Sequence, residues 1–317
     1  MTAYFYFGRR HFKIRPSGVR EGNLFAGCAV SNCVSTNDRR YLSRARVVLF
    51  HGYDLTMFDV PSERTAHQLY VYWSREAPPM LDMPFGALNS AFNLTMTYRR
   101  DSDIVYPYFE TVRREPARTT GPAEPGGPRA TPAAAAWAVS HCVTPGRREQ
   151  YVAELQRHLP VHVFGACGTR ECGGSGAPRN TLSCYRRLAR NYTFYLAFEN
   201  SMCRDYITEK LFLALQAGLV PVVRGASRAE YAAVAPPDSF VHVDDFAGPR
   251  ELAAHLRHLA RNASALARLT AWRESFVVRY VHGWCGLCAR MVQQDGPVTT
   301  RYDDLRRWWY DGSHCQS

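Results

Sequence analysis

The chain has 317 residues, enough for one large domain or two domains of ordinary size. With 46% hydrophobic and 21% charged residues it has a globular composition, which excludes an intrinsically disordered chain. No run of eighteen apolar residues occurs, so the sequence predicts no membrane-spanning segment within these residues.

The formal net charge is +11, and all but two of the 39 basic residues are arginines. The lysines are Lys13 and Lys210. The arginines are spread along the chain without a run of five or six like charges, which disfavours a nucleic-acid partner. A small anion such as a nucleotide diphosphate needs only two or three of these cations.

Apolar runs in the first part of the chain predict strands at residues 3–7, 46–50, 68–73 and 94–98. The apolar start is followed at once by Arg9 and Arg10, so no signal peptide is predicted there. Residues 115–136 are dense in Pro and Gly and predict a linker.

After the linker, strands alternate with helices. Strands are predicted at 136–140, 161–164, 194–198, 219–223 and 239–243, and helices at 147–159, 208–217 and 250–261. This alternation predicts an α/β fold with a parallel sheet covered on both faces. Two such domains joined by a linker are typical of an enzyme that binds its ligand in a cleft.

The segment 194–210 carries the clearest chemistry. Its strand ends in Glu199 and Asn200, and a helix is predicted to open at Thr208, which can cap it. Glu209 and Lys210 then lie in the first helical turn, where the helix N-terminus attracts phosphate. The alternative is that both are merely solvated. No Gly-rich dinucleotide or Walker loop is present, which argues against NAD or ATPase chemistry.

The ten cysteines favour disulfides in an oxidising compartment. Three glycosylation sequons, at Asn93, Asn191 and Asn262, agree with this. Zinc is the alternative, because the pairs Cys28/Cys33 and Cys285/Cys288 together have spacings that suit a four-cysteine site.

The segment FYLAFENSMCRDYITEK at 194–210 closely resembles the signature of the α1,3-fucosyltransferase family. FNLTMTYRRDSDI at 92–104 and VHVDDF at 241–246 also resemble that family. The resemblance implies a GT-B fold of two Rossmann-like domains. It implies a GDP-fucose-binding domain at 137–300, an acceptor-side domain at 1–114, the linker at 115–136 and a tail at 301–317. It also implies an inverting transfer of fucose from GDP-fucose.

Position by position, the resemblance implies which residues bind the donor. These residues are Ser140, Arg148, Asn200, Tyr206, Glu209 and Lys210. Glu209 is expected to bond the ribose, and Lys210 and Arg148 the diphosphate.

Glu76, which follows an apolar-aromatic strand, matches the general base of the family, although Ala77 replaces the usual Ser. The alternative is that Glu76 pairs with a surface arginine. Because cations neutralise the diphosphate, we expect no strictly required metal, although a divalent cation could stimulate the reaction. Asp101 and Asp103 have the spacing of a metal motif but belong to the structural TYRRDSD block of the family.

The resemblance also predicts that Cys28 and Cys33 bridge to Cys285 and Cys288. The pairing of Cys142, Cys167, Cys172, Cys184, Cys203 and Cys315 is left open. Their motifs, such as GACGTREC at 165–172, resemble invertebrate and plant enzymes that act on the Asn-linked core GlcNAc.

We therefore expect a glycoprotein N-glycan acceptor, with the core GlcNAc favoured over a Lewis-type N-acetyllactosamine. A catalytically inactive glycan-binding relative is the remote alternative. The family is typically lumenal in the Golgi, held by an anchor that this sequence does not show.

Overall fold

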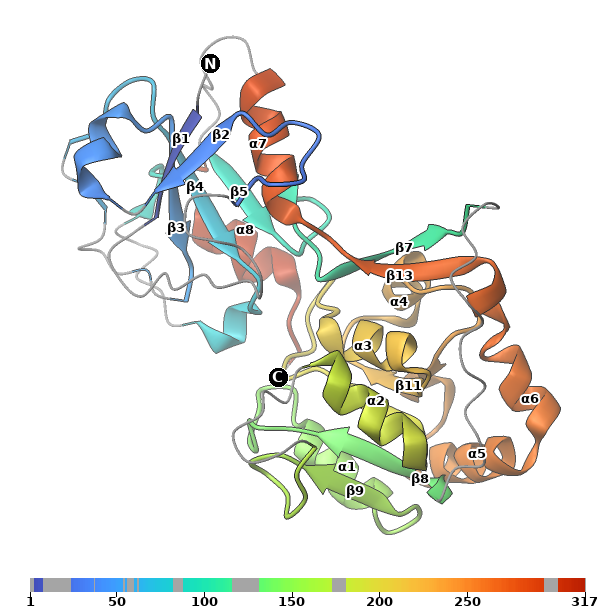
Figure 1. Cartoon of the computed structure of the whole chain (residues 1–317). Helices are drawn as coiled ribbons and strands as arrows, with labels where there is room; N and C mark the ends of the chain where they lie inside the picture. Colours follow the sequence, from blue (N-terminus) through green and yellow to red (C-terminus); the bar gives the residue numbers. More distant parts are fainter. Residues whose placement is uncertain are drawn as a thin grey trace. The chain divides into compact units, whose positions relative to one another are not determined.

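The computed structural model describes residues 3–7, 24–36, 38–53, 55, 60–61, 63–81, 88–115, 131–172, 181–293 and 302–316. The chain folds into two units, which Figure 1 shows as separate α/β bodies. Unit 1 contains Met1–Pro107 and Val281–Cys315, and unit 2 contains Tyr108–Tyr280 and Gln316–Ser317. The predicted boundary at 114 lies close to this division, but residues 281–293 belong to unit 1 instead of to the predicted donor domain.

Unit 1 is built on a six-stranded sheet of order β2-β1-β3-β4-β5-β6, in which every pair is parallel. Its strands are β1 (Ala3–Phe7), β2 (Cys33–Thr36), β3 (Val47–His51), β4 (Leu69–Ser74), β5 (Leu94–Thr97) and β6 (Ile104–Val105). All six residues of the central strand β4 are buried, as expected for a parallel sheet covered on both faces. The four predicted strands at 3–7, 46–50, 68–73 and 94–98 are confirmed to within a residue.

Helices of unit 1 come from both ends of its sequence. They are the short 3₁₀ helices η1 (Arg39–Arg44), η2 (Pro78–Met80) and η6 (Asp311–Ser313) and the α-helices α7 (Gly283–Gln293) and α8 (Leu305–Trp309). Helix α7 packs Trp284, Leu287 and Met291 into the same apolar cluster as Trp73 of β4. The Trp73 and Trp284 ring centroids are 5.1 Å apart.

The C-terminal segment is fixed by Arg99, whose side chain is only 1% exposed. Its guanidinium pairs with Asp101 at 2.6 Å, donates to the Trp308 carbonyl oxygen and lies 4.1 Å from the Trp308 ring centroid. A buried arginine needs this complete set of partners. The predicted tail at 301–317 is therefore, from residue 302 to 315, a packed part of unit 1.

Unit 2 is built on a five-stranded parallel sheet of order β12-β11-β10-β8-β9. Its strands are β8 (Thr131–Ala138), β9 (Val161–Phe164), β10 (Tyr192–Phe198), β11 (Val220–Arg224) and β12 (Val241–His242). A separate antiparallel pair joins β7 (Phe109–Arg113) to β13 (Phe276–Tyr280).

Helices cover both faces of the unit 2 sheet (Figure 1). One apolar cluster includes α2 (Leu182–Asn191), α3 (Glu209–Ala217) and α4 (Arg228–Val234). The other includes α1 (Arg148–Leu155), α5 (Pro249–Arg261) and α6 (Ala263–Arg268). The short helices η4 (Val243–Asp245) and η5 (Ala271–Glu274) complete the unit. The predicted two-sided α/β architecture is confirmed.

Some local features of unit 2 differ from the expectations. Strand β8 begins at Thr131, inside the predicted linker, because the alanine run before Trp137 is narrow enough to lie buried between β9 and β10. Helix α2 was not predicted, because the many arginines in its sequence obscure the apolar pattern of its buried residues Cys184, Tyr185 and Leu188. The remaining linker residues 116–130 lie outside the described residues.

Disulfides connect distant parts of unit 1. Cys28 bonds to Cys285 and Cys33 to Cys288, which confirms the predicted pairing. Cys28 and Cys285 also lie beside the Nδ1 atom of His282. Their sulfurs are bonded to each other, so they are not the thiolates that zinc requires.

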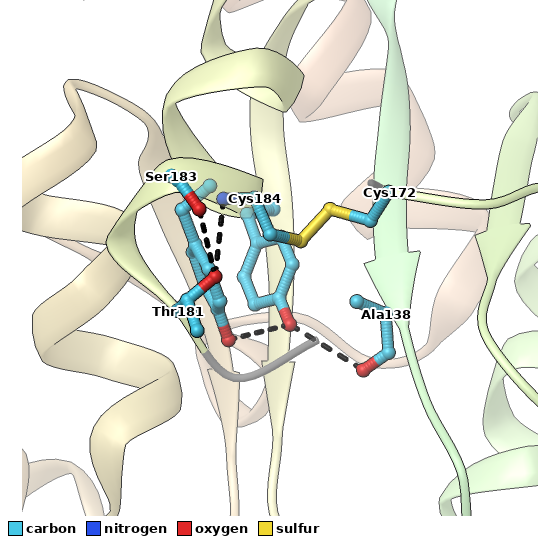
Figure 2. Close-up of a disulfide and its surroundings, with 7 residues drawn as sticks. Ala138, Cys172, Thr181, Ser183 and Cys184 are labelled. Atoms are coloured by element: carbon cyan, nitrogen blue, oxygen red, sulfur yellow. Dashed lines mark hydrogen bonds between the residues drawn. A yellow bond between two sulfur atoms is a disulfide. The ribbon is translucent and has the colours of Figure 1, made fainter. Parts of the chain in front are cut away.

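The other six cysteines are also oxidised. Cys142 bonds to Cys167, and Cys172 bonds to Cys184 (Figure 2). Cys203 and Cys315 are each disulfide-bonded as well. The prediction of disulfides rather than a four-cysteine zinc site is therefore confirmed. Within the described residues, no helix has the length and apolarity needed to cross a membrane.

Replacing Cys33 and Cys288 together by serine is expected to lower the free energy of unfolding by about 2 kcal/mol, because the Cys28–Cys285 bridge remains and the second bridge then closes only a short loop in the unfolded chain. Denaturant unfolding of the double variant measures this. An unchanged midpoint would show that the bridge adds no stability.

Candidate functional site

The candidate donor site lies in unit 2, at the carboxyl ends of β8, β10 and β11. In open parallel sheets this edge is where ligands bind. Three short segments meet there: the loop after β8, the segment from Glu199 to Thr208 after β10, and Arg224 to Ser227 after β11. Their side chains supply the charges described next.

A buried carboxylate organises the start of α3. The Glu199 side chain is fully buried and accepts hydrogen bonds from the Thr208 backbone N–H at 2.8 Å and the Thr208 hydroxyl at 2.8 Å. The Lys210 Nζ atom donates to the same carboxylate at 2.9 Å. Thr208 is the N-cap residue, but its hydroxyl makes these contacts and does not cap the helix. The expected capping role of its side chain was wrong.

Lys210 has an acceptor for each of its three ammonium protons. These are Glu199 at 2.9 Å, the Thr208 hydroxyl oxygen at 2.7 Å and Glu209 at 3.4 Å. Burial alone would lower the pKa of Lys210, but the carboxylates of Glu199 and Glu209 outweigh it, so the pKa lies above its ordinary value. Lys210 is therefore a fixed positive charge at any physiological pH.

The pKa values of the two carboxylates shift in opposite directions. Burial raises the pKa of Glu199, whereas for Glu209 the effect of burial is outweighed by Lys210 and the pKa is lowered. The Glu209 side chain is 19% exposed, so it is the carboxylate of the pair that solvent reaches.

Arg148 is the first residue of α1 and is buried. It donates to the carbonyl oxygen of Phe198 at 2.8 Å and to that of His141 at 3.3 Å. Its Nε atom has no hydrogen-bond partner within the described part of the chain. Burial lowers its pKa, although an arginine stays charged. Arg148 thus ties the loop after β8 to the end of β10 and keeps one donor unused.

Asn200 lies beside these groups. Its backbone oxygen accepts from the Gly146 N–H at 2.8 Å, and a Cβ atom at Gly146 would lie 3.1 Å from that oxygen. The side-chain Oδ1 atom of Asn200 is buried and has no partner in the described structure. Buried polar atoms without partners are uncommon in folded proteins, and a bound ligand or water at this edge would satisfy this oxygen.

The remaining predicted donor residues differ in exposure. Tyr206 is fully buried in the segment before α3, whereas Ser140 is exposed in the loop after β8. Among the described residues, the structure thus gathers Arg148, Asn200, Glu209 and Lys210 around one sheet edge.

Sequence reasoning missed three groups at this edge. Glu199 was noted only as the end of a strand, yet it holds Thr208 and Lys210. Arg224 donates to the Gly146 carbonyl at 2.5 Å and supports the loop after β8. Gly225 leaves the space that Glu199 fills, since a Cβ atom there would lie 2.8 Å from Glu199 Cγ. The signal available for Glu199 was its position as a charged residue directly after the apolar strand β10, all of whose residues are buried.

Glu76 belongs to unit 1 and follows β4. The Ser74 hydroxyl accepts from the Glu76 N–H at 3.2 Å and donates to the Glu76 carbonyl at 3.1 Å, which fixes this turn. Ala77 and Pro78 behind it are buried, and the Arg75 guanidinium lies 4.7 Å from the Tyr106 ring centroid. The Glu76 side chain is held on a rigid turn and is partly exposed.

The three sequons lie in different settings. Asn93 is buried, and its Oδ1 atom accepts from the Tyr70 N–H at 2.9 Å. Asn191 is exposed at the end of α2. The Oδ1 atom of Asn262 caps α6 by accepting from the Ala265 N–H.

Family models match both halves of the chain. The model described as "Fucosyltransferase, N-terminal" matches residues 4–109, and "Glycosyltransferase family 10 (fucosyltransferase) C-term" matches residues 129–308. The chain belongs to the family 10 fucosyltransferases. It is therefore a glycosyltransferase, as its sequence motifs predicted.

Curated relatives agree with this family. The chain is 43% identical to bovine "Alpha-(1,3)-fucosyltransferase 7", over 91% of this chain and 81% of that protein. It is 34% identical to Drosophila melanogaster "Glycoprotein 3-alpha-L-fucosyltransferase A", over 95% of this chain and 59% of that protein. The human "3-galactosyl-N-acetylglucosaminide 4-alpha-L-fucosyltransferase FUT3" is 37% identical, over 86% of this chain and 74% of that protein.

A solved structure shares the fold of this fucosyltransferase. "Crystal Structure of alpha1,3-Fucosyltransferase with GDP-fucose" superposes with a TM-score of 0.60 at 13% identity, covering 94% of this chain and 92% of that chain. The expected GT-B class, with two α/β units, is confirmed.

The space at Gly225 gives a test of the site's packing. Gly225→Ala is expected to lower the free energy of unfolding by about 1–3 kcal/mol, because the φ of +159° at this position disfavours a side chain and because the added Cβ atom would press on Glu199, which three hydrogen bonds hold in place. Gly248→Ala is the matched control, since no atom lies within 4 Å of a Cβ atom there. Equal thermal stability of the two variants would contradict the packing described for Glu199.

Proposed function

We propose that this fucosyltransferase moves L-fucose from GDP-fucose to O3 of a GlcNAc on a glycoprotein glycan, with inversion at the anomeric carbon. The observation that carries the proposal is the set of Arg148, Asn200, Glu209 and Lys210 gathered at one sheet edge of unit 2. The solved α1,3-fucosyltransferase with the same fold, whose title names GDP-fucose, supports this choice of donor.

The donor is bound by charge and by hydrogen bonds. Lys210 and the unused Nε donor of Arg148 supply positive charge for the diphosphate. Glu209, the solvent-reached carboxylate, accepts from the ribose hydroxyls. Asn200, Tyr206 and Ser140 complete the donor contacts. As the bond to fucose breaks, negative charge grows on GDP, and these fixed cations stabilise it.

Glu76 is the general base in this proposal. It takes the proton from the acceptor hydroxyl as that oxygen attacks C1 of fucose, through an oxocarbenium-like transition state. The turn made with the Ser74 hydroxyl holds the carboxylate for this step. Because Lys210 and Arg148 already neutralise the leaving group, the reaction strictly requires no metal, although a divalent cation can stimulate it.

The acceptor is proposed to be the Asn-linked core GlcNAc of a glycoprotein. Two observations support this acceptor. All cysteines in the motifs that resemble core enzymes are disulfide-bonded, and the chain is 34% identical to a Drosophila glycoprotein 3-α-L-fucosyltransferase. N-acetyllactosamine is the second candidate, supported by the 37% identity to the human 3-galactosyl-N-acetylglucosaminide enzyme. Oxidised cysteines also support a place in the Golgi lumen.

The proposed function is tested with GDP-fucose and a panel of core N-glycans and N-acetyllactosamine, followed by mass and linkage analysis. We expect a single added fucose in α1,3 linkage to GlcNAc on the core glycans. Transfer to N-acetyllactosamine alone would select the second candidate. Binding of a glycan with no transfer to any acceptor would indicate an inactive relative and contradict the proposal.

Glu76→Gln is expected to lower kcat by about 10²–10⁴-fold, because the amide cannot accept the proton. Its affinity for GDP, measured by calorimetry, should stay within about twofold of the wild type, since Glu76 does not bind the donor. Glu63→Gln, which replaces an exposed carboxylate of unit 1, is the control. Full activity of Glu76→Gln would overturn the assignment of the base.

Treatment with EDTA is expected to leave most of the transferase activity, because the leaving group is neutralised by side chains. Complete loss of activity that only a divalent cation restores would contradict a metal-independent mechanism.

A further inference from the structure

The buried carboxylate of Glu199 has no role in the donor contacts proposed above. It is fully buried behind Lys210, whose side chain is 17% exposed, and Glu209, whose side chain is 19% exposed. Thr208, the other close neighbour of the ammonium, is 1% exposed. A ligand therefore approaches the ammonium from the side of Glu209, with Glu199 and Thr208 on the opposite, interior side.

The three contacts of Lys210 differ in length, and two of the three acceptors are also hydrogen-bonded to each other. Its contacts with the Thr208 hydroxyl at 2.7 Å and with Glu199 at 2.9 Å are short, and Thr208 also donates to Glu199. These three groups form a closed set in the interior. The contact with Glu209 at 3.4 Å is the longest and is the one next to solvent.

We propose that Glu199 is a positioning residue for the transferase reaction. Together with Thr208 it holds the Lys210 ammonium from the interior side, so that the N–H facing Glu209 is the one that donates a hydrogen bond to the diphosphate of the donor. The contact with Glu209 is exchanged for a phosphate oxygen when GDP-fucose binds. Glu209 is then released to accept from the ribose. This inference rests on the proposed role of Lys210 at the diphosphate.

Glu199 also keeps the ammonium charged. The charged and titratable groups that face Lys210 are Glu199 after β10, Glu209 on α3, Arg148 on α1 and Tyr195 on β10, which bonds Tyr185 of α2 at 2.8 Å. Burial and Arg148 both disfavour the charged lysine, and Glu199 is the strongest of the groups that favour it. Without the Glu199 charge, the pKa of Lys210 falls.

The test measures GDP affinity and steady-state kinetics for Glu199→Gln, which keeps the shape of the side chain but removes its charge. We expect the dissociation constant of GDP to rise about tenfold or more, since a charged hydrogen bond that fixes the ammonium is lost. Glu110→Gln is the control, because Glu110 makes an exposed ion pair with Arg279 on β13. Unchanged GDP affinity in Glu199→Gln would overturn the proposal. Tighter binding would also overturn it, because Glu199 would then compete with the diphosphate for the ammonium.

A pH series separates positioning from a purely structural role. As the pH rises above neutrality, the GDP affinity of Glu199→Gln should fall relative to that of the wild type, because without the Glu199 charge Lys210 loses its proton at a lower pH. A variant that was only less well folded would lose affinity equally at every pH. Parallel pH profiles for the two proteins would therefore contradict the proposal.

Two further variants distinguish this proposal from the proposed function itself. If Lys210→Met binds GDP like the wild type, the role of Lys210 at the diphosphate is wrong. If Lys210→Met binds weakly but its effect adds fully to that of Glu199→Gln, only the coupling to Glu199 is wrong. Thr208→Val removes the second interior contact without removing charge, and it should weaken GDP binding by about threefold to about tenfold even if Glu199→Gln fails to fold.

Discussion

One buried negative charge constrains the site of this protein. Glu199 directly follows the central strand of unit 2, and its side chain is fully buried. An unpaired charge in that position would cost roughly 3–5 kcal/mol by comparison with broken buried pairs. The Thr208 N–H, the Thr208 hydroxyl and the Lys210 ammonium satisfy it. Each of these groups lies at the start of α3, so satisfying the charge also fixes where that helix begins.

The same constraint explains the neighbouring small and polar residues. Gly225 gives Glu199 its space, and Tyr231 lies behind that glycine. Arg148 and Arg224 hold the loop after β8 through backbone carbonyl oxygens rather than through carboxylates, so their charges are not cancelled by an ion pair with an acid in these contacts. The site is therefore assembled mainly by side chain to backbone bonds and one buried ion pair, which favours a fixed geometry before the donor arrives.

Unit 1 depends on a different constraint: α7 and α8, which come late in the sequence, must pack against a sheet formed by the first part of the chain. Helix α7 lies more than two hundred residues after Cys28 and Cys33, and two disulfides join these segments. The buried Arg99 then fixes α8 through the Trp308 carbonyl. These links give the sheet that carries Glu76 a closed apolar face, which its own short strands do not supply.

The sequence predicted the features that depend on local pattern. The strand before Glu199, the helix after Thr208 and the two-sided sheet all follow from apolar runs and from the motif that places the chain in its family. It did not predict that α7 and α8 belong to unit 1. The only signal that linked these late residues to the first part of the chain was the disulfide pairing implied by the family resemblance. The sequence also assigned Thr208 to helix capping, since no local rule shows that a buried carboxylate will use the same hydroxyl. Glu199 was passed over for that reason: its partner Lys210 is eleven residues later in sequence.

The scarcity of lysine makes a direct measurement possible. Because the chain has only Lys13 and Lys210, selective ¹⁵N labelling of lysine gives two Nζ signals, and Lys210→Arg assigns them. We expect the Lys210 signal to be that of a protonated ammonium protected from exchange with water, and we expect saturating GDP to shift it while it stays protonated. A Lys210 signal that exchanges freely with water, or one that GDP leaves unchanged, would contradict the claim that Glu199 holds this ammonium for the diphosphate.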